Sequence, residues 1–389
     1  MELFDITITS LYGLENVLCE ELKALGIQEV EILNRAVKIK GDLEMLYKCN
    51  YLLRTAVKVL KPIASFRAFN DQQLYQEIYK IEWDQYFNFT QTFAIDGSTS
   101  GELFTHSKYI ALKSKDAIAD QFRNKYEERP SVDTEDPDIR INIHISNETV
   151  NVSLDSSGNI LSKRNYRLNQ TEASMNEVLA AGIILLSGWN KQSDFIDPMC
   201  GSGTLAIEAA LMAYNIPPGS NRKFGFETWN DFDKNLWSSV KEKADQQKIN
   251  FTGKIYAREI ERKSLSIAMT NADRAGVKEY INFEQKDFFE SEYTGGNGVV
   301  VINPPYGERI AVDEIVDFYK DMGTRLKHFY PGCNAWIISS NYEALKHFGL
   351  RPTRKIKLFN GPLECRLNKY ELYQGSKRSN NNDSNEIQV

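Results

Sequence analysis

Hydrophobic and polar residues follow different rhythms in successive parts of the chain. From residue 1 to residue 66, short runs of alternating hydrophobic residues, which predict strands, are separated by stretches with helical spacing. The expected strands span residues 3–9, 30–33, 36–39 and 54–66, and the expected helices span residues 13–25 and 42–53. Asp42 is a suitable N-cap for the second helix. These elements predict a small α+β unit over residues 1–66.

A second α+β pattern covers residues 67–155. Its expected helices span residues 71–81 and 107–126, and its expected strands span residues 92–97, 139–145 and 149–155. The first unit has the order strand–helix–strand–strand–helix–strand, which is typical of ferredoxin-like folds. The second unit contains no paired carboxylates, no nucleophile next to a base and no cluster of metal ligands. Candidate chemistry therefore lies further along the chain.

After a linker at residues 156–170, strands alternate with helices over residues 171–374. The expected strands span residues 194–197, 254–257, 281–285, 298–303 and 335–339, and the expected helices span residues 173–189, 205–214, 262–275 and 312–330. This alternation predicts an α/β fold with a largely parallel, doubly wound sheet and a final strand pair at residues 355–358 and 369–373. The stretch that includes residues 217–219 and 224–237 looks like an insertion, and the polar tail, residues 375–389, is expected to be disordered.

Composition and charge restrict the class of protein. A chain of 389 residues with 42% hydrophobic residues can bury the cores of two or three domains. A formal net charge of −6 excludes a protein that is basic throughout, but it does not exclude a basic face. Residues 346–369 hold seven Lys or Arg residues against one acid, Glu364.

Residue usage also limits the compartment and the cofactors. The five cysteines form no CxxC pair and the four histidines have no ligand spacing, so neither a metal site nor a disulfide framework has support. The longest apolar run, residues 178–186, is much shorter than the roughly 20 residues of a membrane span. The start of the chain lacks the pattern of a signal peptide. We expect a cytoplasmic protein without a membrane or metal partner, and the oligomeric state is not predicted.

A short basic segment, residues 161–167 (LSKRNYR), follows the second unit. It contains Lys163, Arg164 and Arg167 around Tyr166 and no acid. One interpretation is a solvated connector. The other is a contact with a polynucleotide, in which the cations meet phosphates and the ring stacks on a base. The sequence leaves both interpretations open.

The strongest local motif is DPMCGSGT, residues 197–204, which lies between an expected strand and an expected helix. Glycines at such a turn let the backbone approach a ligand and adopt otherwise strained dihedral angles. Ligands of open α/β sheets bind at the carboxyl ends of the strands. Gly201, Gly203 and Ala206 also satisfy a loose G-x-G-x-x-G/A pattern. The motif predicts a nucleotide or nucleoside cofactor without identifying it.

Two later acids follow expected strands and sharpen this prediction. Glu259 can accept hydrogen bonds from ribose hydroxyls, and Asp287 can accept one from an adenine amino group. A nicotinamide dinucleotide is the main alternative, but its ribose-binding acid is expected about 20 residues after the glycine turn. Glu259 lies more than twice that distance away, so a dinucleotide is disfavoured.

The motif NPPY, residues 303–306, directly follows the apolar run GVVVI. Pro304 and Pro305 stiffen the turn. The Asn303 amide oxygen and a proline carbonyl can both accept from an NH₂ group, and Tyr306 offers a ring on which a planar base can stack. The motif therefore predicts a grip on the exocyclic amino group of a base.

These residues resemble those of class I S-adenosylmethionine-dependent methyltransferases that methylate amino groups. Over about residues 1–374, the chain resembles the bacterial THUMP-domain RNA methyltransferases, and in particular the 23S ribosomal RNA guanine-N2 group. The resemblance implies a ferredoxin-like unit at residues 1–66, a THUMP RNA-binding unit at residues 67–155 and a Rossmann-like methyltransferase domain at residues 171–374.

The resemblance also implies roles for individual residues. The S-adenosylmethionine cofactor would be bound by Asp197, Pro198, Cys200, Gly201, Ser202, Gly203, Thr204, Glu259, Ile260, Asp287 and Phe288. The catalytic group would be Asn303, Pro304, Pro305 and Tyr306. The usual acid in the position of Glu259 is Asp, and Glu177 matches a recurrent Glu of unassigned role. RNA is the implied partner, and it is expected along Lys163, Arg164 and Arg167 and along residues 346–369.

Three other functions remain open. NPPY also suits adenine N6 in DNA or RNA, and a transfer RNA guanine-N2 methyltransferase would share the same architecture. An RNA-binding module with a degenerate methyltransferase domain is the alternative outside the enzymes, but the intact glycine turn and NPPY disfavour it. The mechanism expected of the enzyme relies on positioning and electrostatics rather than on a strong base.

Overall fold

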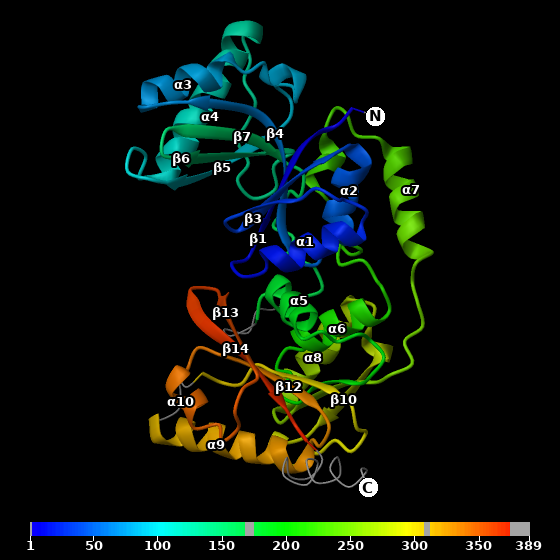
Figure 1. Cartoon of the computed structure of the whole chain (residues 1–389). Coiled ribbons are helices and arrows are strands. Elements are labelled where there is room, and N and C mark those ends of the chain that lie inside the picture. The colour runs from blue at the N-terminus through cyan, green and yellow to red at the C-terminus, as the bar shows by residue number, and fades with distance from the viewer. Residues whose placement is uncertain (1, 168–174, 307–311, 374–389) are drawn as a thin grey trace, which may run out of the picture. The chain divides into compact units, whose positions relative to one another are not determined.

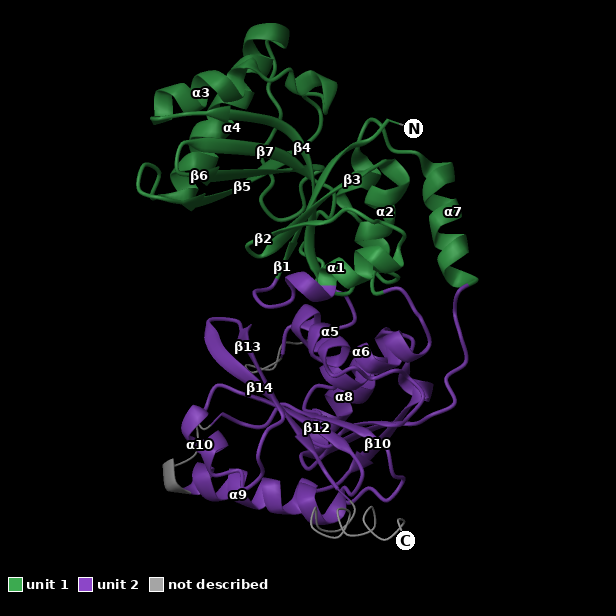
Figure 2. Cartoon of the chain, viewed as in Figure 1, with its two compact units in different colours: residues 1–10, 18–163, 218–246 green, residues 11–17, 164–217, 247–389 purple. Residues whose placement is uncertain are grey.

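The structure of the chain is a computed structural model that describes residues 2–167, 175–306 and 312–373, without the side chains of residues 312 and 313. The tail expected to be disordered lies outside the described residues. The chain divides into two compact units (Figure 2). Unit 1 contains residues 1–10, 18–163 and 218–246, and unit 2 contains residues 11–17, 164–217 and 247–389.

Unit 1 is built on a seven-stranded sheet with the strand order β2-β3-β1-β4-β7-β6-β5. Its strands are β1 (Phe4–Ser10), β2 (Glu31–Leu33), β3 (Ala36–Gly41), β4 (Ala56–Arg67), β5 (Phe93–Ser100), β6 (Ile139–Ser146) and β7 (Thr149–Asp155). The predicted boundary at residue 66 falls inside β4, which pairs with β1 on one side and with β7 on the other. The two predicted α+β units therefore share one continuous sheet.

The helices of unit 1 pack on this sheet, except for α7, which packs on α2 (Figure 1). They are most of α1 (Glu15–Ala24), α2 (Leu43–Leu52), α3 (Asp71–Lys80), α4 (Ser107–Tyr126) and α7 (Lys234–Asp245), with short 3₁₀ turns η1 (Trp83–Gln85) and η2 (Gly225–Thr228). The N-cap predicted for α2 is present, because Asp42 accepts from the Met45 backbone N–H at 2.9 Å. The order β1-α1-β2-β3-α2-β4 is the ferredoxin-like order that the hydrophobic pattern predicted.

The stretch that looked like an insertion completes the core of unit 1. Phe224, Phe226, Trp229 and Trp237 are buried in the same hydrophobic cluster as the strands β1 and β4. Tyr47 of α2 stacks on Phe226 with ring centroids 4.3 Å apart. Aromatic residues bury large areas and stabilise such packing. The chain therefore leaves unit 2 after residue 217, contributes α7 to unit 1 and returns at residue 247.

Unit 2 contains the predicted α/β sheet, with the order β10-β9-β8-β11-β12-β14-β13. Its strands are β8 (Phe195–Asp197), β9 (Ile255–Glu259), β10 (Ile281–Gln285), β11 (Val299–Ile302), β12 (Asn334–Ser339), β13 (Arg354–Asn360) and β14 (Leu363–Glu371). The first five in this order run parallel, and β14 runs antiparallel to both β12 and β13. This is the doubly wound sheet expected from the sequence.

Helices cover both faces of the second sheet, with α5, α6 and α8 on one face and α9 on the other (Figure 1). The elements are α5 (Glu177–Leu186), α6 (Thr204–Ala213), α8 (Arg262–Arg274), α9 (Val312–Phe329) and α10 (Tyr342–Lys346), with 3₁₀ turns η3 (Lys278–Tyr280) and η4 (Phe288–Glu290). Every residue of α6 is buried, as expected for a helix that is apolar on almost all sides.

Candidate active site

The carboxyl ends of four neighbouring strands bring the predicted site residues to one edge of the second sheet. In the order β10, β9, β8 and β11, these strands end at or just before Asp287, Glu259, Asp197 and Asn303. The strand β8 pairs with β9 on one side and with β11 on the other. The strand order therefore reverses at β8, which makes this edge a topological switch point. Ligands of open α/β sheets bind at such a point.

The glycine turn between β8 and α6 has the backbone conformation that its composition predicts. Gly201 and Gly203 have φ angles of 52° and 84°, in the left-handed region. A Cβ atom on Gly203 would lie 2.9 Å from the Cβ of Ala268 in α8, whereas one on Gly201 would meet nothing within 4 Å. Gly203 therefore permits close packing of α6 on α8, and Gly201 leaves open space beside the turn.

Asp197 is the last residue of β8, and only 1% of its surface is exposed. Its carboxylate is therefore buried. Neither carboxylate oxygen has a hydrogen-bond partner of normal geometry among the described residues. Burial raises the pKa of Asp197 well above its ordinary value; the nearby Met199 backbone N–H opposes this effect, and the Glu259 carboxylate adds to it. A buried carboxylate without partners is costly, so this group is suited to a ligand that supplies N–H donors or positive charge.

Glu259 is the last residue of β9 and is already tied to the turn. Its Oε2 accepts from the Gly201 backbone N–H at 2.9 Å, and its Oε1 accepts from the Glu261 backbone N–H at 3.0 Å. A carboxylate oxygen can accept more than one hydrogen bond, so Glu259 can hold the turn and still receive two hydroxyl donors. The next residue, Ile260, is 61% exposed and lies at the surface beside this carboxylate.

Asp287 and Phe288 are placed differently from each other. The Asp287 carboxylate caps η4 by accepting from the Phe289 backbone N–H at 2.9 Å, and it remains partly exposed. The Phe288 ring is buried in the core of unit 2 and stacks near Tyr330, with ring centroids 6.1 Å apart. Asp287 can therefore reach a ligand with its side chain, whereas the ring of Phe288 is engaged in the core.

The other residues of the turn are fixed by backbone and side-chain hydrogen bonds. The Cys200 backbone N–H donates to the Arg258 carbonyl at 2.8 Å, and Asn271 Nδ2 donates to the Ser202 carbonyl at 3.0 Å. Pro198 and Thr204 are buried at the two ends of the turn. These contacts hold the turn rigidly between β9 and α8.

NPPY follows β11, and the structure gives its Asn303 a partner that the sequence did not predict. The Tyr306 hydroxyl donates to Asn303 Oδ1 at 2.6 Å. The Asn303 oxygen is therefore engaged by the protein, whereas the sequence suggested that it would be available to a substrate. Burial raises the pKa of Tyr306, so its hydroxyl keeps its proton. The second lone pair of Oδ1 remains for another donor.

Several residues that sequence reasoning missed support NPPY. Tyr319 of α9 donates to the Pro305 carbonyl at 3.4 Å, and Asn341 Nδ2 donates to the Tyr306 carbonyl at 3.3 Å. Asn360 Nδ2 lies 3.5 Å from the Tyr306 hydroxyl. Asn341 lies two residues after the end of the buried strand β12, and this position near a strand end is the signal that could have identified it.

The basic segment at residues 161–167 does not present three cations to solvent. Arg164 is 2% exposed, and its Nε lies 3.7 Å from Oε1 of Glu208 in α6. Arg167 is also largely buried and pairs with Glu177 of α5, with Nε and Oε1 3.1 Å apart. The expectation of an exposed basic segment is therefore wrong for these two residues. Lys163 is exposed, and its contact with RNA stays a prediction.

Arg167 also links this segment to the glycine turn. One of its terminal nitrogens donates to Thr204 Oγ1 at 2.9 Å and to the Met175 carbonyl at 3.0 Å. Thr204 is the first residue of α6, directly after Gly203. The arginine thus joins the start of α5 to the start of α6, and the recurrent glutamate of unassigned role, Glu177, is its charge partner.

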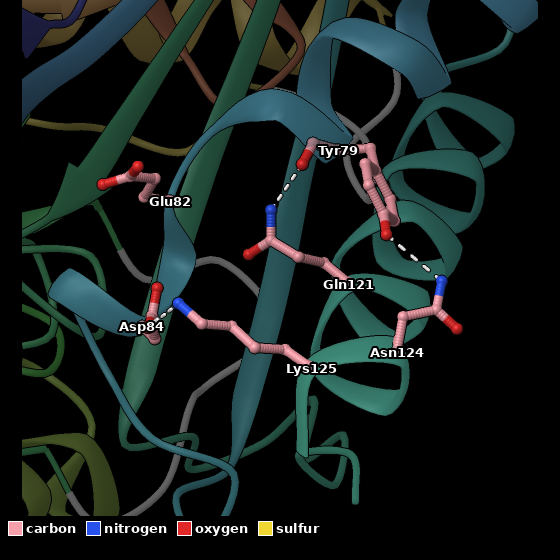
Figure 3. A pocket seen from close by; sticks show the side chains of 6 residues that line it. All are labelled: Tyr79, Glu82, Asp84, Gln121, Asn124 and Lys125. Carbon is pink, nitrogen blue, oxygen red and sulfur yellow. Dashed lines mark hydrogen bonds and ion pairs between the residues drawn. The ribbon is translucent and has the colours of Figure 1, made fainter. Parts of the chain in front are cut away.

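Unit 1 has a surface hollow away from these residues (Figure 3). It is lined by Tyr79, Glu82, Asp84, Gln121, Asn124 and Lys125. The polar groups bind one another: Gln121 Nε2 donates to the Tyr79 carbonyl, Asn124 Nδ2 donates to the Tyr79 hydroxyl at 3.1 Å, and Lys125 pairs with Asp84. These bonds fasten α3 and η1 to α4, and a structural role accounts for them.

Two further observations concern only the described part of the chain. Within it, no group of three or more His, Cys, Asp or Glu side chains is arranged to hold a metal ion. No helix among the described residues is long and apolar enough to cross a membrane. The five cysteines are buried and unpaired.

Comparison with protein-family models gives three matches along the chain. Residues 164–369 match the methyltransferase domain of RMKL-like proteins, residues 68–155 match the THUMP domain, and residues 5–60 match the RlmL ferredoxin-like domain. The order of the matches agrees with the order of the three patterns read from the sequence.

Two relatives illustrate the similarity of sequence. The ribosomal RNA large subunit methyltransferase K/L of Photobacterium profundum is 39% identical over 381 residues, which cover 95% of this chain and 53% of that protein. The chain thus spans about half the length of this relative. A candidate RNA methyltransferase of Synechocystis is 38% identical over 93% of this chain and 95% of its own length.

Two solved structures have the same fold. A candidate methyltransferase crystallised in complex with SAH is 30% identical, with a TM-score of 0.86 over 97% of this chain and 100% of that one. A Listeria monocytogenes protein described as a predicted N6-adenine-specific DNA methylase is 29% identical, with a TM-score of 0.84 over 96% and 97% of the two chains. The chain belongs to the RMKL-like methyltransferase family and carries a THUMP domain.

Proposed function

We propose that the chain is an S-adenosylmethionine-dependent RNA methyltransferase that acts on an exocyclic amino nitrogen, namely guanine N2 of large-subunit ribosomal RNA. The observation that carries the proposal is the placement of Asp197 and Asn303 at the ends of the neighbouring strands β8 and β11. Asp197 offers a buried carboxylate with no hydrogen-bond partner among the described residues, and Asn303 offers an amide in the NPPY turn. A cofactor and an amino-bearing base can therefore meet at this edge.

The residues present fit S-adenosylmethionine. Its cationic groups suit the buried Asp197 carboxylate, its ribose hydroxyls suit Glu259, and Asp287 can accept from its adenine amino group. The open space beside Gly201 admits a ligand close to the backbone. When bound, this sulfonium supplies an electrophilic methyl group. The relative solved with SAH, the demethylated form of the cofactor, has the same fold and supports this assignment.

The residues of NPPY orient the base. The Asn303 amide oxygen and the Pro304 carbonyl accept from the NH₂ group, which localises the nitrogen lone pair and stabilises the positive charge that develops on the nitrogen. Tyr306 either shares Asn303 with the base or releases it when the base arrives. Its half-buried ring is suited to stack on a base that has been flipped out of its stack. No strong base is required before the attack.

RNA as the substrate is supported by the THUMP match and by the names of the relatives. Guanine N2 in 23S ribosomal RNA rests on the resemblance to that group. The proposed site of action is the cytoplasm, where ribosomal RNA of bacteria is made. The second candidate is adenine N6, which is supported by the description of the Listeria structure and by the NPPY motif.

The decisive experiment is the transfer of a labelled methyl group to bulk ribosomal RNA, transfer RNA and DNA from cells that lack the protein. Nuclease digestion and mass spectrometry of the labelled product identify the nucleic acid, the base and the position together. We expect label in N2-methylguanosine of large-subunit RNA. Label in N6-methyladenine would show that the target is adenine N6 and not guanine N2. Absence of label in every nucleic acid would overturn the proposed function.

Substitution of Asn303 tests the mechanism. We expect Asn303→Ala to lower the rate of transfer by about 10²- to 10³-fold, because it removes an acceptor that acts on the developing charge. The affinity for SAH, measured by calorimetry, should not change. Asp197→Ala should show the converse pattern, with weaker SAH binding. Full transfer by Asn303→Ala would remove this residue from the mechanism.

A further inference from the structure

The β13–β14 hairpin extends past the edge of the sheet at which the candidate active site lies. Because β14 is antiparallel to β12, its residue Arg366 pairs with Ser339 at the carboxyl end of β12. The hairpin residues between Leu358 and Cys365 therefore continue beyond that end. Asn360, near the turn, lies 3.5 Å from the Tyr306 hydroxyl. The end of the hairpin thus borders the NPPY turn.

The two faces of this hairpin differ in character. Leu358, Cys365 and Leu367 lie on one face and are fully buried. The pairing register places Lys357 opposite Arg366, and Phe359 opposite Glu364, on the other face. We call this second face, together with the aromatic residues that contact it, the basic face. It consists of Lys355, Lys357, Phe359 and Arg366, with Tyr12 and Tyr342 at its border.

The basic face has positive charge that is open to an anionic partner. Lys355 is exposed and makes no ion pair with any acid of the described chain. The one acid on the face, Glu364, is bound by Lys357 at 2.6 Å and by the Tyr342 hydroxyl at 3.0 Å. Lys357 and Glu364 are both about half exposed, and such surface pairs are weak. A phosphate can therefore compete for Lys357.

Aromatic side chains lie among these cations. The Arg366 guanidinium is stacked over the Tyr342 ring at 4.5 Å, and Lys357 lies 5.4 Å from the centre of the Phe359 ring. Tyr12 packs edge-to-face on Phe359 and is 40% exposed. Cations for phosphates and exposed rings for bases together form the surface that single-stranded nucleic acid prefers.

Protection of a free sheet edge is the other explanation for charges on β13, which is the last strand of the sheet. At Lys357, however, the chain itself covers this edge. A Cβ atom on Gly13 would lie 2.9 Å from the Lys357 carbonyl oxygen, so the backbone of residue 13 already packs against the strand. The charge of Lys357 is therefore not needed to prevent pairing with another strand.

We propose that the basic face binds the phosphates of a single-stranded RNA segment next to the nucleotide that enters the NPPY site. This inference rests on the proposed function, because it takes RNA as the substrate. Lys355, Lys357 and Arg366 contact successive phosphates, and the Tyr12 ring stacks on a flanking base. Asn360, which contacts Tyr306, lies on the opposite face of β13 from Lys355 and Lys357, so the bound strand passes around the end of the hairpin to reach Tyr306.

The test is the variant Lys355→Gln/Lys357→Gln, which removes two charges without introducing repulsion. Its binding to fluorescein-labelled oligouridylate is measured by anisotropy over a range of salt concentrations. The slope of log affinity against log salt should become shallower by about 0.7 for each lost contact. With bulk ribosomal RNA, KM should rise by about tenfold at constant kcat, because positioning charges act on binding alone. SAH affinity and the thermal midpoint should not change.

The matched control is Lys278→Gln/Lys327→Gln. Both lysines are exposed, and they precede β10 and β12, so they lie at the amino ends of the parallel strands, away from the site. This control should retain the salt slope and the KM of the original protein. A slope and a KM that are equal in both double variants would overturn the role of the basic face while leaving the methyltransferase function intact. If the unsubstituted protein binds oligouridylate but transfers no methyl group, the proposed methyltransferase function is overturned and the role of the basic face is not.

Discussion

Two basic stretches of the chain look alike in sequence and differ completely in the structure. Residues 161–167 and the strand β13 both concentrate Lys and Arg near aromatic residues. In the first stretch, Arg164 and Arg167 are buried in ion pairs, whereas on β13 Lys355 and Lys357 are exposed. The difference teaches that the local density of cations does not determine whether they face solvent.

The acidic partners explain the difference. Glu208 and Glu177 are acids in two helices, α6 and α5, that are otherwise almost entirely apolar. An acid on a buried helix needs a cation or it destabilises the fold. Arg164 and Arg167 supply those cations, whereas β13 faces one exposed acid, Glu364. We can therefore test the comparison by removing cations from each stretch.

The largest effect is expected for Arg164→Met. Glu208 has no exposed surface, so among the described residues the variant leaves this buried carboxylate with the hydrogen bond that the Tyr166 hydroxyl donates to it at 3.2 Å. Removing one partner of a buried pair destabilises by about 3–5 kcal/mol. Urea unfolding monitored by circular dichroism measures this change. The double variant Arg164→Met/Glu208→Gln should recover most of it, and a loss below about 1 kcal/mol would show that the pair is not needed.

The second effect concerns Arg167→Met. This variant loses the pair with Glu177 and the hydrogen bond to Thr204 at the start of α6. We expect a loss of about 2–3 kcal/mol in stability, because both a charge pair and a buried donor are removed. We also expect about tenfold weaker SAH binding by calorimetry, since Thr204 directly follows the glycine turn. Thr204→Val, which removes only the hydroxyl, separates the two effects.

If Thr204→Val weakens SAH binding as much as Arg167→Met does, the arginine acts through the turn. If Arg167→Met destabilises the protein but retains full SAH affinity, the arginine is only a structural partner of Glu177. Both variants leave the basic face of the hairpin unchanged, so their affinity for oligouridylate should stay within twofold of the original protein. Substitutions in the first stretch should therefore change stability and SAH affinity, whereas substitutions on the basic face should change oligouridylate affinity.

The ion pair between Arg167 and Glu177 predicts that the stability of the variant depends on pH. Burial raises the pKa of Glu177, and the attraction of Arg167 opposes that rise. In Arg167→Met the pKa rises further. An acid with a higher pKa in the folded than in the unfolded state loses stability as pH rises between the two values. The destabilisation by Arg167→Met should therefore shrink as the pH of the unfolding experiment is lowered from about 7 to about 5. A difference that does not change with pH would exclude Glu177 as its source.

The part of the site that could be predicted from sequence is the part carried by the main chain. Apolar runs followed by Gly, Pro or an acid identify strands and their carboxyl ends, so Asp197, Glu259 and Asn303 were expected at one edge of a parallel sheet. The structure places them on the neighbouring strands β8, β9 and β11. The structure differs from the prediction at Glu259, which is the last residue of β9 and was expected to follow that strand.

The side-chain partners could not be predicted, because they depend on contacts between distant elements. The bond from Tyr306 to Asn303 requires the actual shape of the turn, and the bond from Arg167 to Thr204 joins residues that are 37 positions apart. The stretch around Trp237 looked like an insertion, and nothing in the sequence showed that its aromatic residues complete the core of unit 1. A lone acid in an apolar helix, such as Glu208, was an available signal of a buried cation.

The smallest effect on stability is expected for the exposed lysines. Lys163→Gln and Lys355→Gln should each change the free energy of unfolding by less than about 0.5 kcal/mol, because both lysines are exposed. Their effects on oligouridylate binding should differ. Lys355 belongs to a face with two further cations, so its loss should make the salt slope shallower by about 0.7, whereas Lys163 is the one exposed cation left in its segment. If Lys163→Gln has the larger effect on the slope, RNA follows the first stretch despite the burial of its arginines, and the order of the two stretches is reversed.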